Sequence, residues 1–257
     1  MSQLIRFSFA LTPRLQSFVD LRDGLQCLNQ ARQHQDTYGW LLAANDVRAS
    51  LMGSTGRKAA IPELMALMKA MRLHLDDLAK KHPDFQEDIM HACATIKDHE
   101  TTLHQCIPAV LDFLATDGLL IAWNNALQKN DALAYKLNFP QILPTLWNFL
   151  RIQDLLDKHL EELCAITTHI DAMLNDFVPW LSRTADEGHD QITSSTGNKN
   201  GLLIIGLNST WIERGIVPDF SGNRLAIRLR FLAWNPGSEQ TTCHENIPYQ
   251  MMMVPIT

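Results

Sequence analysis

The chain has 257 residues with a net charge of −6, and 46% hydrophobic and 19% charged side chains, a composition that excludes a disordered chain and is typical of a globular protein. No apolar run approaches the roughly 20 residues of a membrane-spanning helix, and the N-terminus lacks the basic start and long apolar region of a signal peptide. The acidic total argues against general nucleic-acid binding, which usually requires a net basic domain.

The charge is distributed unevenly along the chain. Residues 1–60 hold seven basic and four acidic side chains, residues 61–200 hold 11 and 20, and residues 201–257 hold four of each. A local basic surface is therefore compatible with an acidic protein. The arginines of the last segment cluster in one short stretch, at Arg224, Arg228 and Arg230.

The first predicted elements are a short strand and a helix. Side chains alternate from Leu4 to Leu11, which predicts a strand. Thr12 followed by Pro13 is typical of a helix start, with Thr12 as the N-cap. Apolar residues then recur at three- and four-residue spacing as far as Leu28, which predicts an amphipathic helix.

Further helices are expected as far as residue 181. Their predicted ranges are 36–50, 63–80, 84–105, 108–114, 117–128, 144–151 and 152–181. The connections between them are short, and short connections favour antiparallel neighbours. We therefore expect a long antiparallel helical bundle.

The composition changes at residue 182. Residues 182–200 are polar and almost free of large apolar side chains, which predicts a loop or linker. Beyond it the apolar period switches from 3.6 to 2, which predicts strands at 202–207, 223–234 and 249–254. The N-terminal strand should join this sheet, because a lone strand needs a partner for its backbone groups.

These elements together predict an α+β fold with two domains. The helical domain spans residues 12–181. The β domain combines residues 1–11 with residues 201–257 and forms a small antiparallel sheet from the C-terminal strands and the N-terminal strand. Residues 182–200 form the polar loop that links the two.

The strand that contains the clustered arginines allows two interpretations. Because side chains alternate along a strand, one side carries the apolar residues Leu225, Ile227, Leu229 and Phe231, and the other carries Arg224, Arg228 and Arg230. The arginines could simply keep an edge strand soluble. They could also bind a carboxylate-bearing partner, since a planar guanidinium grips a carboxylate through two parallel hydrogen bonds.

Motifs for catalysis or metal binding are missing from the sequence. It has no GxSxG, HExxH, GxGxxG or CxxC pattern. Residues 53–58 look faintly like a phosphate-binding loop but lack the required spacing, so we expect a connection between helices. The spacings of His91, His99 and His104 do not place them on one helix face as metal ligands. We expect no enzyme activity, no cofactor and no metal, and free thiols at the scattered cysteines.

Three stretches resemble one known family. Phe7–Leu28 is a strand ending in Phe-x-x-Leu and a helix rich in arginine and leucine. Leu143–Leu150 is an aromatic helix that begins Leu-Pro-Thr-Leu, and Ser221–Arg228 is a strand with the pattern Ser-Gly followed by Ala-Ile-Arg. In this order they resemble segments of the ZapD family, cytoplasmic proteins associated with the tubulin-like division protein FtsZ.

The resemblance implies a cell-division protein that acts as a homodimer joined through its helical domain. Such a protein binds the C-terminal tail of FtsZ on a basic surface, cross-links the filaments and promotes Z-ring assembly at mid-cell. The matching basic positions in this sequence are Arg14, Arg22, Arg57, Arg224 and Arg228. Arg230 adds a further arginine on the same face, whereas Gln16 and Asp20 stand where the family often has arginine.

The main alternative function is a nucleic-acid-binding adaptor that uses the same arginines. Single-stranded nucleic acids are usually bound on stacking aromatic side chains. The only aromatic residues near the arginines are Phe231 and Trp234, and alternation directs Phe231 toward the core. The sequence therefore favours an acidic peptide as the partner.

Overall fold

The computed structural model describes residues 4–53, 59–128, 152–175, 177–193, 200–223, 225–234, 237 and 239–256. The chain divides into two compact units. The helical unit comprises Ser17–Asp171, and the β unit comprises Met1–Gln16 together with Ala172–Thr257. Helices and antiparallel four-stranded sheets are both present, so the predicted α+β class is confirmed.

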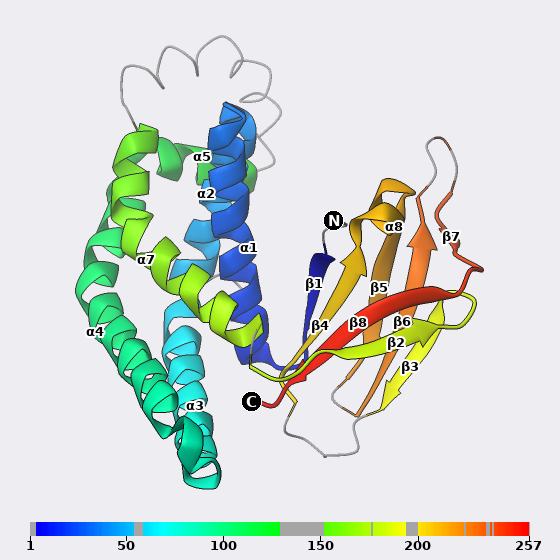
Figure 1. Ribbon diagram of the computed structural model, residues 1–257. Coiled ribbons are helices and arrows are strands. Elements are labelled where there is room, and N and C mark those ends of the chain that lie inside the picture. The colour runs from blue at the N-terminus through cyan, green and yellow to red at the C-terminus, as the bar shows by residue number, and fades with distance from the viewer. Residues whose placement is uncertain are drawn as a thin grey trace. The chain divides into compact units, whose positions relative to one another are not determined.

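Long helices make up most of the helical unit (Figure 1). They are α1 (Pro13–Gln33), α2 (Thr37–Met52), α3 (Ala60–Lys81), α4 (Gln86–Thr116), α5 (Gly118–Gln128) and α7 (Ile152–Asn175), with a turn of 3-10 helix at Pro83–Phe85. The first residues of α1 and the last residues of α7 belong to the β unit. The predicted helix at 144–151 lies outside the described residues.

The start of α1 agrees with the sequence. The helix begins at Pro13, and the Thr12 hydroxyl accepts a hydrogen bond of 3.2 Å from the backbone N–H of Leu15. The threonine cap satisfies the N–H of Leu15, which the first turn leaves without a helical partner, and Pro13 at the first helical position has no N–H of its own to satisfy. The predicted N-cap is confirmed.

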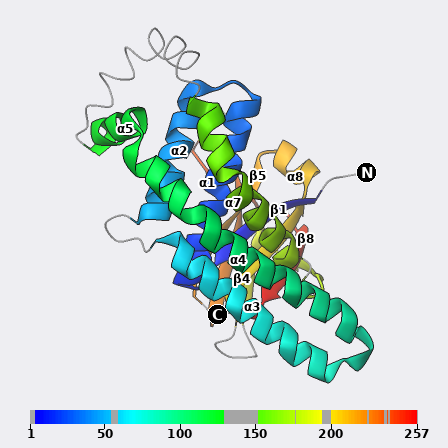
Figure 2. The ribbon, with the colours of Figure 1, turned by 90° about the vertical axis from the view of Figure 1, so that its left-hand side faces the viewer.

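Helices α3 and α4 form a long antiparallel hairpin, visible in Figures 1 and 2. Arg72 on α3 donates a hydrogen bond of 3.0 Å to Glu100 on α4, and the Cys93 thiol on α4 lies 3.7 Å from a carboxylate oxygen of Asp76 on α3. Residue numbers rise along one helix as they fall along the other, which is the antiparallel arrangement expected from a short connection.

Helix α4 corrects one prediction. The sequence predicts separate helices on either side of Pro108, but α4 continues through this residue to Thr116. Proline removes one helical hydrogen bond, which costs stability. The apolar stripe continues across it, because Leu103, Ile107, Val110 and Leu114 are all buried, and this burial outweighs the local penalty.

The β unit contains two antiparallel sheets. The first has the order β1-β4-β8-β2, and in the second β6 lies between β3 and β5 and also pairs with β7. The strands are β1 (Leu4–Ala10), β2 (Leu181–Ala185), β3 (His189–Thr193), β4 (Leu202–Asn208), β5 (Ile216–Gly222), β6 (Ala226–Ala233), β7 (Thr241–Thr242) and β8 (Ile247–Val254). The predicted pairing of the N-terminal strand is confirmed, since β1 pairs with β4.

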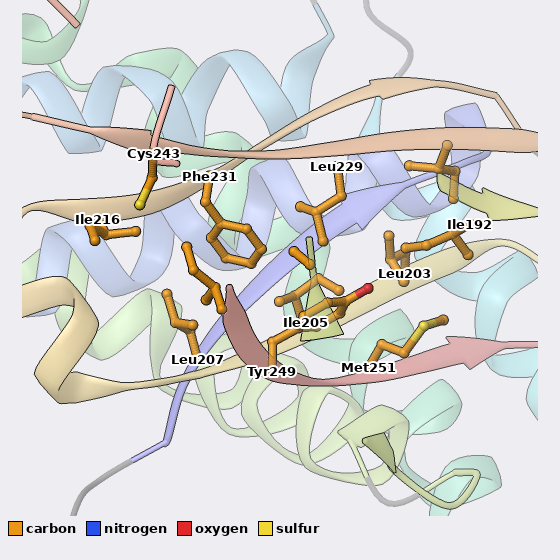
Figure 3. Packing of buried hydrophobic residues seen from close by; sticks show 13 residues of the cluster. Ile192, Leu203, Ile205, Leu207, Ile216, Leu229, Phe231, Cys243, Tyr249 and Met251 are labelled. Atoms are coloured by element: carbon orange, nitrogen blue, oxygen red, sulfur yellow. The ribbon is translucent and has the colours of Figure 1, made fainter. Parts of the chain in front are cut away.

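The two sheets pack face to face around a shared apolar core (Figure 3). Strand β4 contributes Leu203, Ile205 and Leu207, and β6 contributes Leu229 and Phe231. Each of these side chains is essentially inaccessible to solvent. The β unit is therefore a sandwich of two sheets rather than the single small sheet that the sequence predicts.

The predicted loop at 182–200 is wrong over its first half. It contains most of β2 and all of β3, joined by a tight turn in which Glu187 and Gly188 have positive φ angles. Both strands lie at sheet edges, and each buries one side chain fully, Ala185 and Ile192. Because edge strands with so little buried surface have mostly polar residues, their sequence pattern resembles that of a loop.

The described part of the chain contains no single helix that is both long and apolar enough to span a membrane. Residues 83–116 and 118–125 meet that length and composition only when the two helical segments are taken together, and they are bent by 61° at the break between them.

Candidate functional site

Strand β6 carries apolar residues on one side and arginines on the other. Ile227, Leu229 and Phe231 are almost completely buried in the sandwich core, and Figure 3 shows Leu229 and Phe231 directed into it. Arg228 is exposed and Arg230 is half-buried on the opposite side. The predicted alternation is confirmed for these residues. Leu225 precedes the strand and is 59% exposed, so its predicted core position is wrong.

Strand β6 is the central strand of its sheet. Strand β3 pairs with it on one side and β5 on the other. The interpretation of the arginines as solubilising groups on an edge strand is therefore wrong. Directly paired residues lie on the same side of a sheet, so the neighbours of the arginines follow from the register.

The register defines a polar surface that we call the arginine face. Arg228 lies between Gln191 of β3 and Ser221 of β5. Arg230 lies between His189 of β3 and Asp219 of β5. The arginine face consists of these side chains: His189, Gln191, Asp219, Ser221, Arg228 and Arg230. Of the carboxylates on the described strands, Asp219 is the one placed in this surface by the register.

Arg230 and Asp219 form an ion pair across the two strands. The Nε and Nη2 atoms of Arg230 donate hydrogen bonds of 3.1 and 2.5 Å to the same oxygen, Oδ2 of Asp219. Both side chains remain accessible, at 42% and 35%. Arg228 makes no ion pair with the described residues and projects into solvent. The face thus presents one guanidinium open to a ligand and one already paired with a carboxylate.

Arg22 has partners within the helical unit. Its Nη1 atom lies 2.8 Å from Oδ1 of Asp171 on α7, its Nη2 atom lies 2.7 Å from Asp23, and the side chain is only 12% exposed. Burial alone would lower the pKa of the guanidinium, but the hydrogen bond and charge of Asp171, together with Asp23, raise the pKa above its usual value. This geometry gives Arg22 a role in joining two helices.

The other predicted binding residues do not form one described cluster. Arg14 is half-buried near the start of α1 and belongs to the β unit, whereas Arg22 belongs to the helical unit. Arg57 and Arg224 lie outside the described residues. Among the six predicted arginines, the structure brings together Arg228 and Arg230.

A second charged cluster links the two sheets and was missed by the sequence analysis. Arg183 on β2 grips Asp190 on β3 with two hydrogen bonds of 2.8 Å, and the hydroxyl of Tyr249 on β8 donates to the same carboxylate. Burial alone would raise the pKa of Asp190, but these bonds and the charge of Arg183 hold that pKa below its usual value. Burial and the neighbouring carboxylate raise the pKa of Tyr249.

A hollow of about 550 Å³ lies on the sheet that contains β4 and β8. Its lining includes Gly206 and the side chains of Ser182, Asn208, Trp211 and Gln250. The hydroxyl, amide and indole groups can contact a polar molecule, and the lining also includes the guanidinium of Arg183, which is paired with Asp190. The described lining offers no base beside the serine hydroxyl, which nucleophilic catalysis would require.

His99 contacts a histidine of another helix rather than the histidines near it in the sequence. His99 on α4 lies with Nε2 only 2.7 Å from Nδ1 of His169 on α7, and the rings meet edge to face. Burial and the nearby His169 ring lower the pKa of His99. No group of three metal-ligating side chains occurs in the part of the chain that the structure describes.

Comparison with models of known protein families and with curated proteins finds no match for this chain. The family resemblance therefore depends on the three stretches quoted from the sequence. Two of these stretches lie mainly on described elements. Phe7–Leu28 covers parts of β1 and α1, and Ser221–Arg228 covers the end of β5 and the start of β6. Leu143–Leu150 lies outside the described residues.

Proposed function

We propose that this chain is a cytoplasmic cell-division protein of the ZapD type that binds the C-terminal tail of FtsZ. In this proposal it acts as a homodimer joined through its helical unit, cross-links FtsZ filaments at the mid-cell division ring and so promotes Z-ring assembly. It is a binding protein rather than an enzyme, and needs no cofactor.

The observation that carries the proposal is the arginine face. Arg228 and Arg230 lie two residues apart on the outer side of a central strand, whose backbone is fixed by β3 and β5. Pairing on both sides holds the backbone positions of the two arginines at a defined separation, and guanidinium groups bind carboxylates bidentately. The sequence resemblance to the ZapD family includes this same strand.

The expected strength of one site suits a reversible cross-linker. A hydrogen bond to a charged group contributes about 1.5–3 kcal/mol where water is partly excluded, and an exposed ion pair contributes about 0–1 kcal/mol. A few such contacts with some apolar burial give micromolar binding, near −8 kcal/mol. A two-fold dimer that meets many tails on a filament gains apparent affinity by about 10²–10⁴ through avidity.

Sedimentation of FtsZ filaments tests the proposal. The full-length protein should pellet tail-bearing FtsZ as bundles and should leave tail-less FtsZ in the supernatant. A parallel gel-shift assay with DNA and RNA distinguishes the alternative. A protein that shifts nucleic acid and fails to bundle FtsZ would be a nucleic-acid adaptor, and the proposal would then be wrong.

A further inference from the structure

The two arginines of the arginine face have the spacing of an extended peptide. Residues i and i+2 of a strand lie on the same side, about 7 Å apart. Arg228 and Arg230 therefore present guanidinium stems at the same interval as alternate side chains of an extended ligand. Acidic side chains at positions i and i+2 of a bound peptide can meet both arginines, whereas adjacent acidic side chains point to opposite sides.

From this match we infer that the arginine face selects extended peptides whose acidic residues alternate, with Asp219 as an internal competitor for Arg230. The inference deepens the proposed function, because both require an acidic peptide on this face. It adds two points to that function: the acidic residues of the peptide must alternate, and Asp219 competes with the peptide for Arg230.

The two arginine positions are not equivalent toward a carboxylate. Arg228 is flanked by the neutral side chains of Gln191 and Ser221, so an incoming carboxylate meets no like charge in that row of the sheet. Arg230 is flanked by Asp219, whose Oδ2 already accepts two of its hydrogen bonds. A ligand carboxylate at Arg230 must displace Asp219 or tolerate its repulsion.

The ion pair is weak enough to be exchanged. Both side chains are more than one-third exposed, and exposed ion pairs contribute little to stability. A peptide with a single acidic residue gains contact with Arg228 alone. A peptide with a second acidic residue at i+2 can also replace Asp219 at Arg230. The alternating pattern therefore gains a second contact, and the ion pair with Asp219 limits the size of that gain.

Two labelled peptides of identical composition test the spacing. One carries Asp-Thr-Asp and the other Asp-Asp-Thr, each flanked by the same neutral residues, and binding to the full-length protein is measured by fluorescence anisotropy at low salt. We expect the alternating peptide to bind at least threefold more tightly. Arg230→Ala should remove this preference while retaining weak binding of both peptides.

The competitor is tested by Asp219→Asn. This variant should bind the alternating peptide about two- to fivefold more tightly than the wild type, the range expected for releasing an exposed ion pair. Glu213→Gln removes the same charge from the short helix α8 (Ser209–Glu213), outside the arginine face, and controls for the change in net charge. It should change both affinities much less.

The outcomes separate the two proposals. Equal affinities for the two peptides, or an Asp219→Asn effect no larger than that of Glu213→Gln, would overturn the inference even if the protein bundles FtsZ through its tail. A clear spacing preference in a protein that does not bind the FtsZ tail would support the inference and contradict the proposed partner.

Discussion

Arg22 on α1 and Asp171 on α7 form a 2.8 Å ion pair between residues 149 positions apart in the chain. Further along the same two helices, Arg32 pairs with Asp157. Residue numbers run in opposite directions along the two helices, so these pairs fix α1 antiparallel to α7. The pair between Arg22 and Asp171 is largely buried. Arg22 therefore differs in its exposure to solvent from the accessible arginines of β6.

Arg22→Ala should destabilise the helical unit. An exposed pair is worth at most about 1 kcal/mol, and breaking a fully buried one costs about 3–5 kcal/mol, so we expect a loss of about 2 kcal/mol in the free energy of unfolding. Urea denaturation measures it. Arg228→Ala is the matched control and should leave stability within about 0.5 kcal/mol. Equal stabilities of the two variants would refute the structural role of Arg22.

Asp190→Asn should weaken the link between the two sheets in a pH-dependent way. The folded pKa of Asp190 lies below its unfolded value, so its contribution is present above the unfolded pKa, about 3.9, and is lost as pH falls through the folded pKa. The variant should therefore be less stable at pH 7, by about 1–3 kcal/mol. The difference from wild type should shrink below about pH 4. A constant difference across this range would contradict the assignment.

Gly188→Ala should disrupt the turn between β2 and β3. Gly188 has φ of 73°, and a Cβ atom there would lie 2.0 Å from the carbonyl oxygen of Cys243, so the backbone must move. We expect a loss of about 1–3 kcal/mol or more, measured by thermal and urea unfolding. Gly118→Ala is the control, because a Cβ at this helical position meets nothing within 4 Å. It should be neutral or stabilising.

The contact between His99 and His169 should make the helical unit sensitive to mild acid. Burial and the neighbouring ring depress the folded pKa of His99, so the unfolded chain binds a proton more readily. Stability should fall as pH drops through the unfolded value near 6.5 toward the folded one. His99→Gln should flatten this part of the stability profile between pH 8 and 5. An unchanged slope would show that the pair does not govern it.

Bundling of FtsZ should fall steeply with added salt. The proposed contacts are between exposed charges, and the Debye length shortens from about 10 Å at 0.1 M to about 3 Å at 1 M ionic strength. Sedimentation of tail-bearing FtsZ across a salt series measures the effect. Bundling that is unchanged between low and high ionic strength would exclude the arginine-face mechanism.

Local patterns predicted part of the fold well. The Thr12 cap could be predicted because it depends only on Thr12 and the neighbouring Pro13. The inward positions of Ile227, Leu229 and Phe231 could be predicted because side chains alternate strictly along a strand. The strands β2 and β3 could not, because each has one fully buried residue and a polar remainder. Their identity as strands depends on partners elsewhere in the chain, β8 and β6.

Long-range pairing limited what the sequence could say about the site. Alternation placed Arg228 and Arg230 on one face, but the ion pair with Asp219 depends on the register between β5 and β6. The partner of Arg22 lies on a helix more than 100 residues away, so its burial could not be foreseen. Both facts change the expected site, because Arg230 is already paired with Asp219 and Arg22 joins two helices.

Charge reversal at Arg228 tests the central claim most directly. Binding of a labelled FtsZ tail peptide should be lost in Arg228→Glu, and the dimer and the folded state should remain, as measured by light scattering and circular dichroism. Arg214→Glu, an exposed charge reversal in the same unit but outside the arginine face, should retain binding within about threefold. Undiminished tail binding by Arg228→Glu would contradict the account.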